Sequence, residues 1–175
     1  VGVDYIHVEL WKYDEIEEMW IQIFSEDVQG DHYEFTIDED CYHKIIWYAV
    51  DYLGNIETTH EQYHRVDSQP PITEKTVNDP WCGEGQYYVT THTLIELDAV
   101  DQEEPCAVGV KEIHYRYGYD QNNNNEVEEN EFYPWVIVPG DHAEFYFTEE
   151  CLHKLEWYAV DYLGNTEEIH WQYHK

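Results

Sequence analysis

Positive charge is the scarcest feature of this sequence. Its 175 residues contain 8 Lys and Arg against 39 Asp and Glu, which gives a formal net charge of −31. Such a surface repels nucleic acid and anionic lipid headgroups, so neither is expected as a partner. It suits a protein that stays dispersed at high salt or that collects cations. The hydrophobic content of 42% and the aromatic content of 17% nevertheless exclude a disordered chain.

Long apolar runs are also missing. No run approaches the roughly 20 residues that span a bilayer, so membrane insertion is not expected. No signal-peptide pattern is visible, and Val1 stands inside a strand-like alternation. We therefore expect the numbering to start within a longer precursor.

Cysteine is present but never in a CxxC pair. Four cysteines beside a single Met are compatible with disulfides and an extracellular or cell-surface location. A reduced cytosolic protein with buried thiols is the alternative. The sequence also lacks a Ser nucleophile elbow, a Gly-rich phosphate loop and a haem-attachment motif, so an enzyme is not expected.

One stretch occurs twice, at residues 41–64 and again at 151–174. Its matching positions lie 110 residues apart; they include Cys41 and Cys151, Trp47 and Trp157, Asp51 and Asp161, Asn55 and Asn165, His60 and His170, and His64 and His174. A repeat of this kind indicates two copies of one domain. We place the first at residues 1–66 and the second at residues 67–175.

Both copies alternate apolar and polar residues with the period of β-strands. Seven strands are expected in the second copy, at residues 72–78, 87–100, 110–118, 132–138, 142–148, 152–161 and 167–174. Only the last five have counterparts in the first copy, where residues 32–37 form one of them. Short strands, regular turns and no helical period predict an all-β protein of two tandem β-sandwiches.

The first copy would thus lack its two opening strands. A sandwich without them exposes an apolar face and an unpaired edge. Either the chain continues upstream of Val1, or a neighbouring repeat or a copy of the same protein donates the missing strands.

The repeated stretch resembles a known family. The pattern Trp-Tyr-Ala-Val-Asp-x-x-Gly-Asn, at residues 47–55 and 157–165, is followed after the first copy by Val-Asp-x-x-Pro-Pro at 66–71. It resembles the Ig-like tandem repeats of bacterial and archaeal cell-surface proteins. The resemblance implies a β-sandwich in a multi-repeat extracellular protein and implies no catalytic residues.

The strongest candidate site is the acidic and Asn-rich run at residues 120–131. Oxygen-bearing side chains recur with the spacing of an EF-hand-type calcium loop; the candidate ligands are Asp120, Asn122, Asn124, Glu126, Glu128 and Glu131. Asn125 stands where Gly is usual, and Asn tolerates the left-handed conformation better than most residues. No helices are expected to flank the loop. The alternative is a solvated hairpin loop without an ion.

A second acidic cluster is expected from topology, since the loop at 98–109 and the turn at 161–166 belong to the same end of the sandwich. Its candidate members are Asp98, Asp101, Glu103, Glu104 and Asp161. The favoured alternative is that Asp161 and Asn165 only hydrogen-bond the backbone of their turn.

Residues 60–64, His-Glu-Gln-Tyr-His, match the zinc-protease pattern HExxH. That chemistry needs a helix to bring both histidines to one ion. In a strand, residues four apart lie about 13 Å from each other. The second copy also lacks the Glu, so no zinc site is expected.

Strand direction suggests how the cysteines pair. Cys41 and Cys151 begin equivalent strands, Cys82 lies at the same end of the second copy, and Cys106 lies at the opposite end. We predict Cys82–Cys151 within the second domain and Cys41–Cys106 between the domains. The rival pair Cys106–Cys151 requires a loop to cross most of the sandwich, because bonded cysteines need Cα atoms within about 7 Å.

The sequence therefore favours a structural module of an extracellular fibre, surface layer or stalk. Such a module would assemble head to tail with neighbouring repeats or copies of itself, and disulfides and calcium would stiffen it. The second hypothesis is an adhesin or carbohydrate-binding module that uses exposed Tyr and Trp.

Overall fold

A computed structural model describes residues 1–84, 87–102 and 106–175 of the chain. The chain divides into two compact units: unit 1 is Val1–Ser68 with Pro105–Ala107, and unit 2 is Gln69–Glu104 with Val108–Lys175. The fold is all-β, as the sequence predicts, and its one helical turn among the described residues is the 3-10 helix η1 (Glu129–Glu131). No described helix has the length and apolar character needed to cross a membrane.

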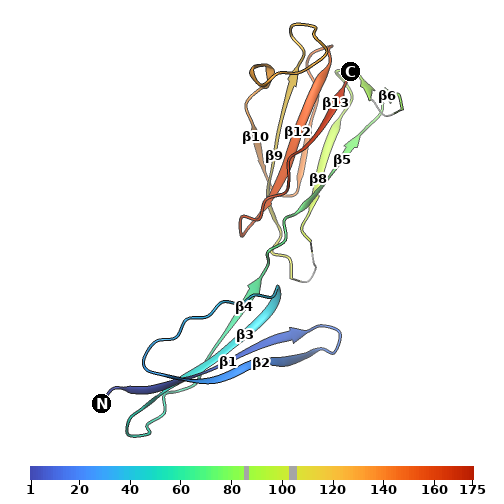
Figure 1. Cartoon of the computed structure of the whole chain (residues 1–175). Coiled ribbons are helices and arrows are strands. Elements are labelled where there is room, and N and C mark those ends of the chain that lie inside the picture. Colours follow the sequence, from blue (N-terminus) through green and yellow to red (C-terminus); the bar gives the residue numbers. More distant parts are fainter. Residues whose placement is uncertain (85–86, 103–105) are drawn as a thin grey trace. The chain divides into compact units, whose positions relative to one another are not determined.

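Unit 1 contains one antiparallel sheet in the order β2-β1-β3-β4 (Figure 1). Its strands are β1 (Val3–Asp14), β2 (Met19–Gln29), β3 (Cys41–Asp51) and β4 (His60–Val66). Alternation along β1 turns Val8 and Leu10 to the buried face, where each is 4% exposed. The neighbouring residues of β1 point to the opposite face, as the period of a strand requires.

Unit 2 is a sandwich of two antiparallel sheets. The first has the order β10-β9-β12-β13 and the second the order β11-β8-β5. Their strands are β5 (Ile72–Val77), β8 (Ile95–Val100), β9 (Val110–Tyr119), β10 (Val136–Pro139), β11 (His142–Phe145), β12 (His153–Asp161) and β13 (His170–His174). A short hairpin of β6 (Trp81–Cys82) and β7 (Tyr88–Val89) accompanies them.

The core of unit 2 fills the space between the two sheets. Alternate residues of facing strands supply it; the cluster consists of Ile95, Leu97, Ala99, Ile113, Tyr115, Ala143, Phe145, Phe147, Leu155, Trp157 and Ala159. Ile95, Leu97, Ile113, Leu155 and Ala159 have no exposed surface. The alternate residues of β8 and β12 that face the opposite sheet are therefore buried, as the period of a strand requires.

The two units repeat one strand register. Trp47 of β3 pairs with Val8 of β1 and with His60 of β4. In unit 2 the equivalent Trp157 of β12 pairs with Tyr115 of β9 and with His170 of β13. The same sheet is thus built twice by residues in matching positions.

The strand expected at 132–138 begins only at Val136, and the one expected at 142–148 ends at Phe145. Two other expected strands differ more. The strand expected at 87–100 is interrupted by a turn at residues 90–93, where Thr90 N donates to Thr93 Oγ1 at 2.9 Å and Thr93 Oγ1 donates to Pro80 O at 2.5 Å. Threonine hydroxyls compete in this way with strand pairing. Residues 32–37 of unit 1 form no strand. Their counterpart β11 pairs with β8, and no strand equivalent to β8 occurs in the described residues of unit 1.

Candidate metal site

The candidate calcium loop leaves β9 at Tyr119 and ends in η1. Two anchors hold it against unit 2. Val127 is 7% exposed, and Gly118 forms a bridge with Phe132. A Cβ at Gly118 would lie 2.7 Å from Glu131 O and 2.9 Å from Val127 Cγ1, so the loop can fold back this closely only over a glycine.

Asp120, the first candidate ligand, organises the loop. Its side chain is buried, and its Oδ1 and Oδ2 accept hydrogen bonds from the backbone N of Asn124 at 3.1 Å and of Asn125 at 2.8 Å. Asn125 adopts a φ of +66° and Asn123 one of +58°. Asn125 thus takes the left-handed conformation for which calcium loops of this type usually have Gly.

The next two candidate ligands form successive turns. Asn122 Oδ1 accepts from Asn124 N at 3.0 Å, and Asn124 Oδ1 accepts from Glu126 N at 2.8 Å. Such Asx turns curl the backbone of the loop. Glu126 and Glu128 remain exposed, and Asn122 Nδ2 lies 3.5 Å from Glu128 Oε2.

Glu131, the last candidate ligand, closes the loop from its far end. It is 5% exposed. Its Oε1 accepts from Gln121 N at 3.0 Å and its Oε2 from Glu128 N at 2.9 Å. The first and last positions of the run are therefore both buried carboxylates that bind the loop backbone.

The donor set suits calcium, which takes six to eight oxygen ligands. Among the described residues, this loop does not bring three carboxylate or imidazole groups within 4.8 Å of one another; the groups that do so lie elsewhere. Backbone carbonyls and water would therefore have to complete a calcium shell here, as they commonly do in calcium loops.

The second predicted cluster is gathered only in part. Asp101 and Asp161 are 7% and 0% exposed, and ligand atoms of the two lie within 4.8 Å of each other. Asp98 is exposed and instead pairs with His142, at 2.7 Å from Oδ1 to Nδ1. Glu103 and Glu104 lie outside the described residues.

The alternative for Asp161, that it binds its own turn, fits the structure well. Its Oδ1 accepts from the backbone N of Leu163 at 2.8 Å, of Gly164 at 2.6 Å and of Asn165 at 2.8 Å. Its Oδ2 accepts from Asn165 Nδ2 at 2.7 Å. In unit 1, similar bonds from residues 53–55 hold the pKa of Asp51 below its usual value, and the amide of Asn55 makes the largest contribution.

Sequence reasoning missed a group on the outer face of the β8–β11 pair. One ligand atom from each of Glu96, His142 and Glu144 lies within 4.8 Å of the others. Glu96 and Glu144 stand directly opposite each other, an arrangement that like charges disfavour. Alternation in residues 142–145 was the available signal, because it places His142 and Glu144 on one face.

The HExxH segment lies on β4, so its histidines do not share a helical face. His60 is exposed and its ring stacks on Trp47, with the centroids 5.2 Å apart. His64 pairs with His43 across the ladder. The segment is part of a sheet, as the sequence predicts.

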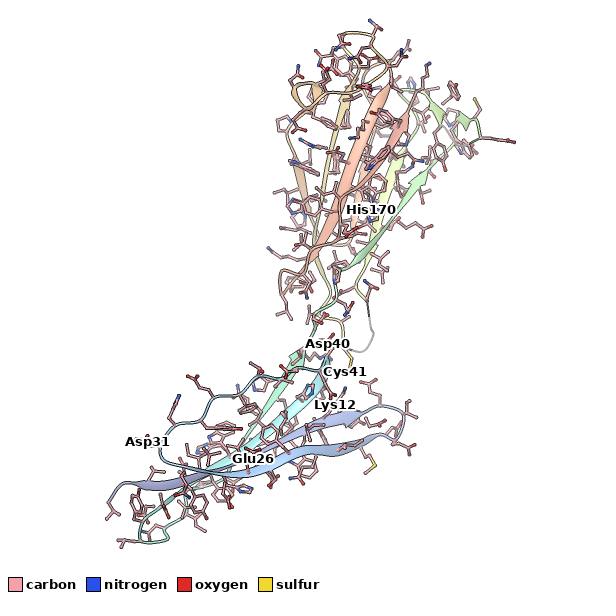
Figure 2. The ribbon with its side chains drawn as sticks, in the orientation of Figure 1. Lys12, Glu26, Asp31, Asp40, Cys41 and His170 are labelled. Atoms are coloured by element: carbon pink, nitrogen blue, oxygen red, sulfur yellow. A yellow bond between two sulfur atoms is a disulfide. The ribbon has the colours of Figure 1, made fainter. Side chains whose placement is uncertain are left out.

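Of the two predicted disulfides, the structure contains only Cys41–Cys106. Cys41 begins β3 (Figure 2), and Cys106 belongs to unit 1 although it lies between β8 and β9 in sequence. The predicted Cys82–Cys151 bond is absent. Cys82 is an exposed thiol on β6, where it faces Tyr88, and Cys151 Sγ donates to Asp120 O at 3.1 Å.

A buried carboxylate is the second feature that sequence reasoning missed. Glu167 is 8% exposed and its Oε1 lies 2.7 Å from Nε2 of His170, which is labelled in Figure 2. Unit 1 repeats the pair with Glu57 and His60 at 3.0 Å. The signal was a Glu-x-x-His pattern at the same place in both copies.

Comparison with protein-family models finds no match, and comparison with curated proteins finds no match in sequence.

Proposed function

We propose that this chain is a structural module of an extracellular repeat protein, built from tandem Ig-like domains. The observation that carries the proposal is the shared strand register of the two units, in which Trp47 and Trp157 pair with equivalent neighbours. A chain that builds the same sheet twice from matching residues has the organisation of repeat proteins that form fibres, surface layers and stalks.

Two further features support a role outside the reducing cytosol. The Cys41–Cys106 bond joins residues 65 positions apart, and structural disulfides persist in oxidising compartments. The net charge of −31 keeps chains apart and attracts cations. We propose that the loop at 120–131 holds one calcium ion and that this ion stiffens unit 2.

Thermal unfolding with millimolar CaCl₂ and with a chelator tests the ion. The midpoint is expected to rise with calcium, because an ion that binds only the folded state stabilises it, and magnesium at the same concentration is expected to do less. An unchanged midpoint would refute the calcium site.

Antibodies against unit 2 are expected to label intact source cells. Labelling that appears only after permeabilisation would contradict the extracellular assignment.

An adhesin or carbohydrate-binding module is the second candidate, because one face of the unit 1 sheet carries an aromatic strip. Trp20 lies with ring centroids 5.3 Å from Tyr13, 5.5 Å from Tyr42 and 5.7 Å from Tyr63. Lys44 Nζ lies 4.8 Å from the Trp20 ring centroid. Aromatic faces of this kind stack on sugar rings. Quenching of tryptophan fluorescence by soluble polysaccharides, lost in Trp20→Ala, would support this candidate.

A further inference from the structure

In unit 2, the first strand of the sandwich is fastened to the last connection by a carboxylate. Glu167 accepts two hydrogen bonds from Thr73 of β5, one from its backbone N at 2.8 Å and one from its Oγ1 at 2.6 Å. Glu167 Oε2 also accepts from Ala159 N at 3.0 Å. With β5 in place, the Glu167 side chain is only 7% exposed.

A second contact fastens the same strand two residues further along. Lys75 Nζ lies 3.3 Å from Nε2 of His174 on β13. Thr73 and Lys75 point to one side of β5 because side chains two apart share a face. Strand β5 thus presents the Thr73 hydroxyl to the Glu167 carboxylate and the Lys75 amine to the His174 imidazole.

Unit 1 contains the same two acceptors without those donors. Glu57 is equivalent to Glu167 and keeps the bond from Ala49 N, at 3.1 Å, and the contact with His60. Its side chain is nevertheless 48% exposed. His64 is equivalent to His174, and its Nε2 is buried with no hydrogen-bond partner among the described residues. A buried, unpaired polar atom of this kind is costly and uncommon.

The apolar face beside these acceptors is open as well. Leu155 and Trp157 in unit 2 are 0% and 7% exposed, whereas their counterparts Ile45 and Trp47 are only partly buried. A hollow of about 270 Å³ passes between Ile45, Trp47 and Phe35. In unit 2 the matching space is filled by the sheet that contains β5 and β8.

The segment that would pair with the second incoming strand is also present. In unit 2, Ala143 and Phe145 of β11 pair with Leu97 and Ile95 of β8. Residues 32–37 of unit 1 occupy the equivalent positions, and Phe35 packs against Phe24 with ring centroids 5.4 Å apart. The segment has no strand pairing, so its backbone groups remain available for an incoming strand.

We propose that unit 1 is completed by an antiparallel pair of strands of the β5–β8 type. Its first strand carries a Thr whose backbone N–H and hydroxyl bind Glu57, and a Lys two residues later that donates to His64. Its second strand pairs with residues 32–37 and places Ile, Leu and Ala side chains over Ile45 and Trp47. The donor is a further repeat of the same kind, so this inference rests on the proposed repeat organisation and names its partner.

A synthetic peptide of residues 69–102, with Cys82→Ser, tests the proposal on the full 175-residue chain. We expect binding of one peptide per chain in calorimetry and a blue shift of tryptophan fluorescence as Trp47 is covered. Glu57→Gln in the chain, and separately Thr73→Val in the peptide, are expected to weaken binding about tenfold, because each removes part of a charge-assisted hydrogen bond.

The matched control is Glu167→Gln, which alters the same site in unit 2. If the peptide instead exchanges with β5 and β8 of unit 2, Glu167→Gln will change its affinity and Glu57→Gln will not, and the proposal fails. Because a strand-pair peptide can aggregate, a fusion that places residues 69–102 before Val1 through a flexible linker provides a second measurement. It is expected to raise the unfolding midpoint of unit 1, and a fusion with a scrambled segment is not.

Three other outcomes overturn the inference. The first is that the peptide does not bind and the fusion leaves the unfolding midpoint of unit 1 unchanged. The second is that the scrambled peptide binds equally well. The third is that the chain alone forms concentration-dependent dimers that Glu57→Gln abolishes, since the occupant would then be a second copy. None of these outcomes involves calcium. A calcium-dependent midpoint without peptide binding would retain the proposed structural role and reject only this partner.

Discussion

Thr73 and Glu167 lie 94 residues apart in sequence and are joined by two hydrogen bonds, one from the backbone and one from the side chain of the threonine. Glu167→Gln keeps the volume of the side chain but turns one acceptor into a donor. We expect a loss of about 2 kcal/mol in the free energy of unfolding of unit 2. Glu57→Gln, at the exposed equivalent position in unit 1, should change the free energy of unfolding of unit 1 only slightly. Urea unfolding of both variants measures the contrast; equal losses would contradict it.

In the candidate calcium loop, one variant can separate loss of the proposed ion from loss of the fold. Asp120→Asn lowers the charge of the buried anchor and keeps one side-chain oxygen, so the rise of the midpoint with calcium should disappear. Gln121→Ala changes an exposed side chain of the same loop whose contact with Glu131 is made by the backbone. It should keep the full rise. Differential scanning calorimetry with calcium and with chelator compares the two variants.

The cysteines should react in an order set by their environments. In the native chain, thiol alkylation should label Cys82 first, because it is exposed, and Cys151 more slowly. Cys41 and Cys106 should be labelled only after reduction. Peptide mapping by mass spectrometry reads the order. If Cys82 were protected from alkylation, the Cys82–Cys151 pairing would have to be reconsidered. Cys106→Ser removes the covalent link between residues 65 positions apart and should destabilise unit 1 by up to about 4 kcal/mol.

Acid should weaken unit 2 through a buried imidazole. Burial is the main reason that the pKa of His174 falls to about 3, and the nearby Lys75 and His153 lower it further. The unfolded chain therefore takes up this proton first, at its ordinary pKa near 6.5. The stabilisation is complete above pH 6.5 and declines as the pH falls toward 3.

Between pH 7 and pH 5 the free energy of unfolding should drop by about 2 kcal/mol through His174 alone. His174→Gln should remove that part of the drop, and His92→Gln, on an exposed turn, should not. Urea titrations at the two pH values measure the difference. A wild-type drop that His174→Gln leaves intact would assign the acid sensitivity to other groups, such as His153, whose pKa burial also lowers.

The strands that could be predicted are those whose own residues determine the pairing face. β1, β3 and β12 alternate strongly, and alternation indicates which residues share a face. In unit 2 the inward residues Leu155 and Trp157 are buried. Glu156 between them is only 9% exposed as well, and it pairs with Arg116 and Lys154. The hydrogen bonds of Asp161 to its own turn could equally be predicted from the sequence, because they form within five consecutive residues.

The features that could not be predicted depend on distant partners. Residues 32–37 have the alternation of a strand, yet a strand also needs a neighbour to bond with. The Thr90–Thr93 turn depends on a hydroxyl that reaches Pro80 O. The environments of Cys82 and Cys151 depend on where the β6–β7 hairpin and the loop at 120–131 lie. No local pattern contains that information.

The disulfide also determines how this chain would carry a pulling force. Tension applied between Val1 and Lys175 would pass from Cys41 to Cys106 through the sulfur atoms and bypass the residues between them. That bypassed stretch includes β3, β4, β5 and β8. About 220 Å of potential extension is thereby withdrawn from the load. The opening strands of unit 2, β5 and β8, would therefore not be extended directly by the pull.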